Sequence, residues 1–232
     1  MALVISTIDV IVSAVFTVLV ARQWFFSRKT HQLLWTVALF VWTLAVLAET
    51  ASAIRGRWDP MSYRIYYAFG ALMVASWLGA GTLFLVAPHR LAVGFFFVTA
   101  LLCVAGCGLI LTHPIDPAQL AQTDALGFVE VKVFPFIPVR ILIVISNILG
   151  TLAFTGGALY SVWRFVRQSL PRRPMIGILL IGLGGLVAAS AHSIGVLGGP
   201  GLFRASELTA IVLIFSGYLL STRLPARTPS PV

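Results

Sequence analysis

Residues 90–112 of the chain read RLAVGFFFVTALLCVAGCGLILT, and Arg90 at the first position is the only charged residue in this run. A helix rises about 1.5 Å per residue, so about 20 apolar residues are needed to cross the hydrocarbon core of a bilayer. Helices and strands of water-soluble domains do not need an uninterrupted apolar run of this length. The run therefore predicts a transmembrane helix.

Six further runs of the same kind lie on either side of it. They cover 2–22, 32–54, 62–87, 138–163, 174–198 and 203–222. The chain of 232 residues is 59% hydrophobic and only 10% charged, whereas about 25% of the residues in soluble domains are charged. We therefore predict an all-α bundle of seven transmembrane helices that occupies residues 1–232 as a single domain, in a multi-pass protein of the cell membrane.

The basic residues predict the orientation of this bundle. The net charge of +9 comes mainly from short connections between apolar runs, where Lys and Arg mark the cytoplasmic side, so we do not expect nucleic acid as a partner. With the N-terminus outside, ten of the 16 basic residues lie on the inner side and six on the outer side. The sequence thus favours an N-out, C-in topology, with an external loop at 113–137 and a cytoplasmic tail at 223–232.

A shift of 140 residues aligns the first three runs with the last three without a gap. Pro60 and Arg64 then fall on Pro200 and Arg204, so two uncommon residue types keep their spacing across a connection. Self-similarity of this kind indicates a duplication. The predicted parts are a first repeat at about 2–87, a linking helix at 90–112 and a second repeat at about 138–222. Because one helix links the repeats, they would be parallel.

Two parallel three-helix repeats around one linking helix resemble the layout of the SWEET and PQ-loop transporters, and the seven-helix layout also resembles that of microbial rhodopsins. The Pro-Gln pair of the PQ-loop family does not occur in the chain. Rhodopsins bind retinal through a lysine of the last helix, but the only lysines here are Lys29 and Lys132, both in connections. We therefore expect no covalently bound retinal and no other cofactor, and neither resemblance assigns a functional residue.

Three acidic residues lie inside the predicted helices. Asp9 belongs to the first helix, Glu49 to the second and Glu207 to the seventh. Ionisable groups within a membrane are costly, and each is a candidate for a functional role. Counted from the helix ends, all three lie roughly 6–11 Å below the outer surface. They therefore share one leaflet.

Further polar groups fall in the same outer layer. Arg64, Arg140 and Arg204 begin the third, fifth and seventh helices, and His192 lies near the end of the sixth. Tyr67 belongs to a series of tyrosines spaced by three and four residues, which places them on one helix face. Since the inner halves of the helices contain almost no charge, the pattern predicts an outward-facing polar pocket in which these residues bind a ligand or protons.

Structural roles remain open for several of these residues. Arg204 and Glu207 are three residues apart and are spaced to pair along one helix, and Arg64 is placed to neutralise an acid of the first two helices. His192 alone is also typical of a packing residue that is hydrogen-bonded between helices. The tyrosines, together with Trp58, equally fit an aromatic belt at the membrane surface.

The leading functional hypothesis is the binding of a small polar or amphiphilic molecule from the outer side, most simply for solute transport, with the acids as proton- or cation-binding groups. The alternative is a sensory or accessory subunit that binds a ligand or a membrane protein partner without turnover. An intramembrane enzyme is the third hypothesis. It ranks last because the chain contains no HExxH, no nucleophile-elbow and no glycine-rich phosphate motif. The histidines are not spaced as metal ligands, so no metal site is predicted.

Overall fold

The computed structural model describes the backbone of residues 2–126, 133–169 and 171–222, and the side chains of these residues except 2, 124–126, 192–198 and 200. The described part of the chain is helical throughout and contains no strand. Its elements are α1 (Ala2–Ser27), α2 (Thr30–Arg55), α3 (Pro60–Ile65), η1 (Tyr66–Met73), α4 (Val74–Val86), α5 (His89–Thr112), α6 (Pro117–Leu126), η2 (Phe136–Arg140), α7 (Ile141–Arg167) and α8 (Arg172–Thr222). The predicted tail at 223–232 lies outside the described residues.

The predicted number of transmembrane helices is confirmed, because seven described segments are long and apolar enough to span a membrane. Two of them belong to α8, which is interrupted at Gly199, where φ is 77°. Only glycine adopts such a positive φ at little cost, so the chain turns here and the two halves of α8, 172–198 and 201–222, form separate spans. The third span consists of α3, η1 and α4, and η1 within it is a π-helix.

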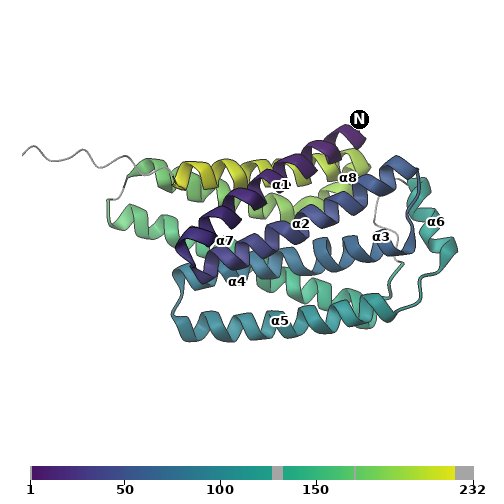
Figure 1. Cartoon of the computed structure of the whole chain (residues 1–232), viewed down its shortest axis with the longest axis horizontal. Coiled ribbons are helices and arrows are strands. Elements are labelled where there is room, and N and C mark those ends of the chain that lie inside the picture. The colour runs from purple at the N-terminus through teal and green to yellow at the C-terminus, as the bar shows by residue number, and fades with distance from the viewer. Residues whose placement is uncertain (1, 127–132, 170, 223–232) are drawn as a thin grey trace, which may run out of the picture.

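The two ends of the bundle differ in their connections (Figure 1). One end, which we call the long-loop end, carries α6, the beginning of α1 and the break in α8. The opposite, short-loop end carries the connections 28–29 and 87–88, the end of α7 and the beginning of α8. Pro88 leads directly into α5 there, because a proline is tolerated only at the start of a helix.

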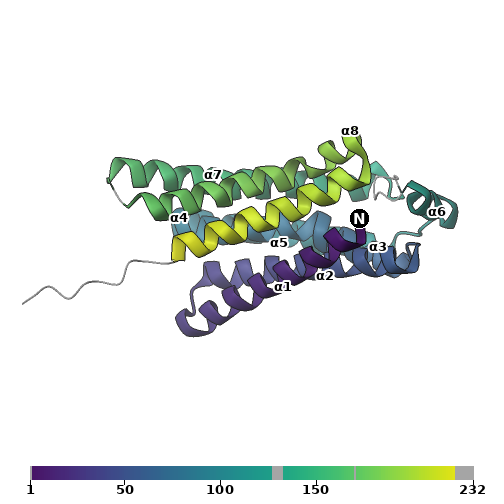
Figure 2. The ribbon, with the colours of Figure 1, turned by 90° about the horizontal axis from the view of Figure 1, so that it is seen from above.

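Six of the seven spans form a ring around the centre of the bundle. α1 packs against α2, α2 against η1 and α4, α4 against α7, and α7 against α8. The second half of α8 closes the ring on α1, where Phe16 and Phe215 stack with their ring centroids 5.0 Å apart. α5 lies outside this ring and contacts α4, η1 and α7. Figure 2 shows α1 and α2 on one side of the molecule and α7 on the opposite side.

Small residues hold the helices close together toward the short-loop end. A Cβ atom at Gly177 would lie only 2.6 Å from the carbonyl oxygen of Gly217, which belongs to the other half of α8. A Cβ at Gly157 of α7 would lie 2.4 Å from the Thr82 side chain of α4. Only glycine permits such close approach, which is how membrane helices gain van der Waals contact. This half of the bundle is therefore closed by packing.

Candidate functional site

Two of the predicted acids are fully buried, and one of them, Glu49, meets an arginine from a distant part of the chain. Asp9 of α1 is 2% exposed, and Glu49 of α2 is 1% exposed. Nε of Arg204, at the start of the second half of α8, lies 2.7 Å from Oε1 of Glu49. The side chain of Trp42 interacts with the Asp9 carboxylate. Arg204, which is also spaced to pair with Glu207 along its own helix, thus forms its ion pair with a residue of another helix.

Glu207 completes a cluster of three acids, which we call the acid cluster (Asp9, Glu49 and Glu207). Its Oε1 lies 3.5 Å from the hydroxyl of Tyr66, and its charge interacts with those of both Glu49 and Asp9. Arg204 is the cation that acts on Glu49 and Glu207. Three carboxylates with one guanidinium would carry an excess of two negative charges, which a membrane interior does not tolerate without protons or other cations.

Arg64 does not join the acid cluster. Its guanidinium donates hydrogen bonds to the carbonyl oxygens of Ile110, Leu111 and His113, of which the last two are 2.8 Å long. These carbonyls belong to the last turn of α5 and have no partner within that helix. The structure therefore gives Arg64 the role of a cap that ties α5 to α3.

A cavity of about 720 Å³ lies inside the ring, between α2, η1, α4, α7 and both halves of α8. Cavities that bind small molecules commonly have volumes of about 300–1,000 Å³. Three of the predicted site residues line it, namely Tyr67, Arg140 and Glu207. Because Glu207 belongs to the acid cluster and also faces the cavity, the two features form one continuous site.

The charged groups of the cavity lie at one end, and the rest of its lining is mostly apolar. Tyr66, Tyr67, Arg140 and Glu207 lie toward the long-loop end. The deeper lining is mainly apolar, with Leu78, Phe154 and Ile214 among its members, and includes the uncharged polar residues Asn147 and Thr151. On α7 the lining extends from 140 to 154, which corresponds to about 21 Å along a helix. The arrangement fits an elongated molecule with a polar head and an apolar body.

The π-helix η1 shapes one wall of this cavity. Tyr66, Tyr67, Gly70 and Ala71 of η1 all line it. A π-helix disturbs the ordinary pattern of backbone hydrogen bonds and occurs frequently at functional sites. The side chain of Asn147 in α7 donates a hydrogen bond of 2.6 Å to the carbonyl oxygen of Ala71. The sequence interpretation missed Asn147, although it is the only asparagine in the chain and lies within an apolar run.

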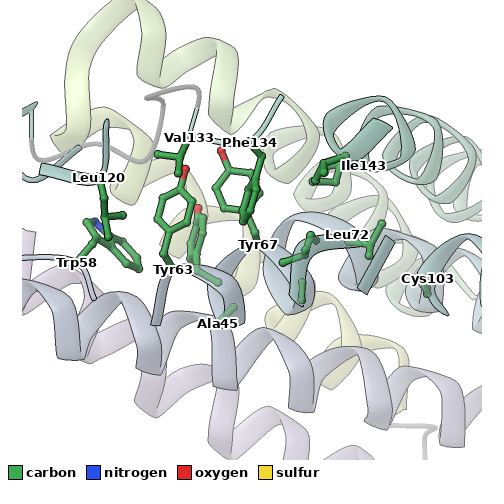
Figure 3. Packing of buried hydrophobic residues seen from close by; sticks show 14 of the residues in the cluster. Ala45, Trp58, Tyr63, Tyr67, Leu72, Cys103, Leu120, Val133, Phe134 and Ile143 are labelled. Carbon is green, nitrogen blue, oxygen red and sulfur yellow. The ribbon is translucent and has the colours of Figure 1, made fainter. Parts of the chain in front are cut away.

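An aromatic cap closes the cavity toward the long-loop end. It consists of Trp58, Tyr63, Tyr66, Tyr67 and Phe134, all at least 90% buried. The ring centroids of Tyr63 and Tyr67 are 4.8 Å apart, and that of Phe134 lies 5.2 Å from that of Tyr67. Figure 3 shows the tyrosines close to Phe134, which belongs to the segment that returns from α6. These aromatic residues pack inside the bundle, so the alternative of a lipid-facing belt is wrong.

Not all predicted groups fall in the described part of the site. The structure describes the backbone of His192, which belongs to α8, but not its side chain. Lys132 lies outside the described residues altogether. Among the side chains that the structure describes, no three His, Cys, Asp or Glu residues converge as metal ligands. No protein-family model, no curated protein and no solved structure matches the chain. The geometry of the site therefore carries the functional assignment.

Proposed function

We propose that this chain is a membrane transporter that moves small amphiphilic molecules in exchange for, or together with, protons. The observation that carries the proposal is the continuity between the cavity and the acid cluster. The three acids Asp9, Glu49 and Glu207 act on one another, and among the described side chains Arg204 is the cation found to act on them, through Glu49 and Glu207. Their charge is therefore balanced only when protons or another cation are present.

Glu207 is the residue through which ligand and protons are coupled. It faces the cavity, contacts Tyr66, and senses the charge of the other two acids. A ligand group that carries positive charge near Glu207 favours loss of a proton from the acid cluster, and departure of that ligand favours its return. Coupled transport of ligand and protons requires at least one site whose charge depends on the binding of both.

The finer topology that we propose is N-out and C-in, with the long-loop end outside, as the distribution of Lys and Arg favours. We also propose that the chain is a parallel duplication. Packing within the ring supports the duplication, because contacts in one repeat have counterparts under the 140-residue shift. The contact of α1 with α2 corresponds to that of α7 with the first half of α8, and the contact of α4 with α7 corresponds to that of the second half of α8 with α1. The linking helix α5 then lies outside the ring.

The cavity wall follows the same 140-residue relation. Three pairs of lining residues are related by it, namely Ala45 with Gly185, Tyr67 with Glu207, and Val74 with Ile214. Parallel repeats with a site between them are one of the known plans of secondary transporters. The difference between Tyr67 and Glu207 means that, among the described lining residues, only the second repeat supplies a carboxylate to the cavity wall.

Transport is tested with purified protein in liposomes that contain a trapped pH-sensitive dye. The vesicles are exposed to a panel of single-chain amphiphiles with cationic, anionic and zwitterionic head groups. We expect at least one of them to change the internal pH, and we expect Glu49→Gln and Glu207→Gln to abolish the change. Asp116→Asn is the matched control, because it makes the analogous change from acid to amide at an exposed position beside α6. Uptake without any pH change, or with an unaltered change in both glutamine variants, contradicts the proposal.

A second candidate function is a binding subunit without turnover, and the closed short-loop half favours it. The cavity ends at apolar residues such as Leu78, and the halves of α8 touch at Gly177 and Gly217 beyond it. A transporter must open this half in another conformation, whereas a sensor or accessory subunit need not. If an amphiphile of the panel binds to the protein but is not taken up into the same vesicles, the result favours a binding subunit over a transporter.

A further inference from the structure

The mouth of the cavity lies between α7 and the first half of α8. Of the described lining residues, only four are exposed, and all four lie along this seam: Val144, Ile148 and Leu152 of α7, which are 44%, 54% and 67% exposed, and Ala189 of α8. The lining residues of α2, η1 and α4 are buried or half-buried. The cavity is therefore open on one side of the ring only.

The same two helices are in close contact on the other side of this mouth, toward the short-loop end. A Cβ at Gly182 would lie 3.2 Å from Cβ of Ala158, and one at Gly185 would lie 2.6 Å from the ring of Phe154. The exposed lining residues begin at Leu152, half a turn from Phe154 along α7. The mouth therefore begins at the point along α7 and α8 where these glycine contacts end.

This mouth faces lipid. Val144, Ile148 and Leu152 are large aliphatic residues in the middle of a transmembrane span, and such residues are exposed to acyl chains. The direct route from water at the long-loop end is blocked by the aromatic cap, with Val133 and Leu120 buried behind it. A ligand that arrives within the bilayer meets an open path, whereas one that arrives from water meets packed aromatic rings.

Arg140 lies at the rim of the mouth. It precedes α7, is half-buried, lines the cavity, and its guanidinium lies 6.0 Å from the ring centre of Phe136. Phe136 and Ile137 beside it are exposed apolar residues at the beginning of the span. Arginine beside exposed aromatic residues is typical of the head-group level of a membrane, and its planar guanidinium binds phosphate in a bidentate manner.

We propose that the ligand is a single-chain amphiphile with a phosphate-bearing zwitterionic head group, and that it enters sideways from the outer leaflet. This inference rests on the proposed function and deepens it. The phosphate binds Arg140, the positive group of the head lies toward Glu207 and Tyr66, and the chain follows the apolar lining to Phe154. Because the acyl chain passes from apolar lipid to a mostly apolar lining, it gains little by entering, and the head-group contacts decide which amphiphile binds.

The test uses lysophosphatidylcholine with a brominated chain, added to wild-type protein in nanodiscs. Bromine quenches nearby indole fluorescence, and Trp42 lines the cavity, so quenching that disappears in Trp42→Phe reports the chain inside it. We expect this signal in the wild type. In Ala189→Phe, which narrows the mouth, it should develop about tenfold more slowly, as expected when access limits association. Leu186→Phe is the control, since Leu186 is exposed on the same helix and does not line the cavity.

A water-soluble competitor separates the two routes of entry. Glycerophosphocholine has the same head group without the chain, and even in large excess it should not slow the quenching of Trp42. An unchanged rate in Ala189→Phe, or efficient competition by glycerophosphocholine, overturns lateral entry while leaving the ligand-binding cavity intact. If no amphiphile of the panel quenches Trp42 when its chain is brominated, the proposed function fails as well. Ile148→Phe, with Leu159→Phe as its control, repeats the test on α7 if the Ala189 variant does not fold.

Discussion

The two halves of this bundle are built from the same helices but differ in what holds them together. Toward the long-loop end, large aromatic side chains, Arg204 and the acid cluster keep the helices apart around a cavity. Toward the short-loop end, glycines such as Gly177 and Gly217 bring the backbones into contact. Side-chain volume therefore decides where this bundle is hollow, and its buried charges lie in the half where the helices supply one another's partners, as Arg204 does for Glu49.

The largest effect is expected from removal of the buried cation in the long-loop half. Arg204→Met leaves Glu49 buried without its partner, and breaking a buried ion pair in this way typically costs about 3–5 kcal/mol. Thermal unfolding in nanodiscs measures the loss. Arg57→Met is the control, because Arg57 is exposed and surface changes typically stay within about 0.5 kcal/mol.

A compensating change sharpens the same prediction. The double variant Arg204→Met with Glu49→Leu removes both charges and should recover much of the lost stability, since a buried ion pair is often replaceable by apolar residues. If Arg204→Met alone melts at the temperature of the wild type, the ion pair does not stabilise the long-loop half.

The next effect tests the packing of the short-loop half. Gly177→Ala forces a methyl group against the backbone of Gly217 and should cost about 1–3 kcal/mol, as overpacking does in other well-packed cores. Gly108→Ala on α5 is the matched control, because no atom lies within 4 Å of its added Cβ. Equal unfolding temperatures for the two variants would show that the halves of α8 are not in tight contact.

A smaller effect is expected where Asn147 supports the π-helix. Asn147→Leu removes the hydrogen bond to the carbonyl oxygen of Ala71, which is half-buried, and should cost about 1 kcal/mol, as the loss of one typical hydrogen bond does. Hydrogen exchange of η1 should increase in this variant. Thr209→Val is a suitable control, since that exposed hydroxyl bonds only to Ala205 of its own helix. Unaltered exchange in η1 would contradict the supporting role.

The smallest effect concerns Asp59, which caps α3 outside the spans. Partial burial raises the pKa of Asp59. Hydrogen bonds from Ser62 and Met61 and the charge of Arg55 lower it by more than burial raises it, so the pKa lies below its ordinary value. The ionised form therefore stabilises the fold above the ordinary pKa, and this contribution is lost as the pH falls through the lowered value. Asp59→Ala should cost about 1 kcal/mol at neutral pH, whereas Asp59→Asn keeps the cap and loses the acid dependence. An acid titration of thermal stability checks both variants, and parallel titrations of wild type and Asp59→Asn would refute the assignment.

The spans were predictable because each is an apolar run of sufficient length, and a bilayer imposes the same requirement on every sequence. The burial of Asp9, Glu49 and Glu207 was predictable on the same grounds. Their partners were not, because the choice of Arg204 between Glu49 and Glu207, and the attachment of Arg64 to α5, depend on how the helices rotate against one another. The π-helix gave no periodic signal that differs from an α-helix, so the wall that it forms escaped prediction.

The position of α5 has a mechanical consequence. It braces the ring on one side only, where it bridges α4 and α7, and Arg64 fastens its end. The opposite junction, between α1 and the second half of α8, has no helix packed outside it among the described elements and is joined by side chains, including the hydrogen bond from the Tyr218 hydroxyl to Gln23 and the contact of Phe16 with Phe215. We therefore expect any movement between the two groups of three spans to pivot about α5, with this side-chain junction separating first.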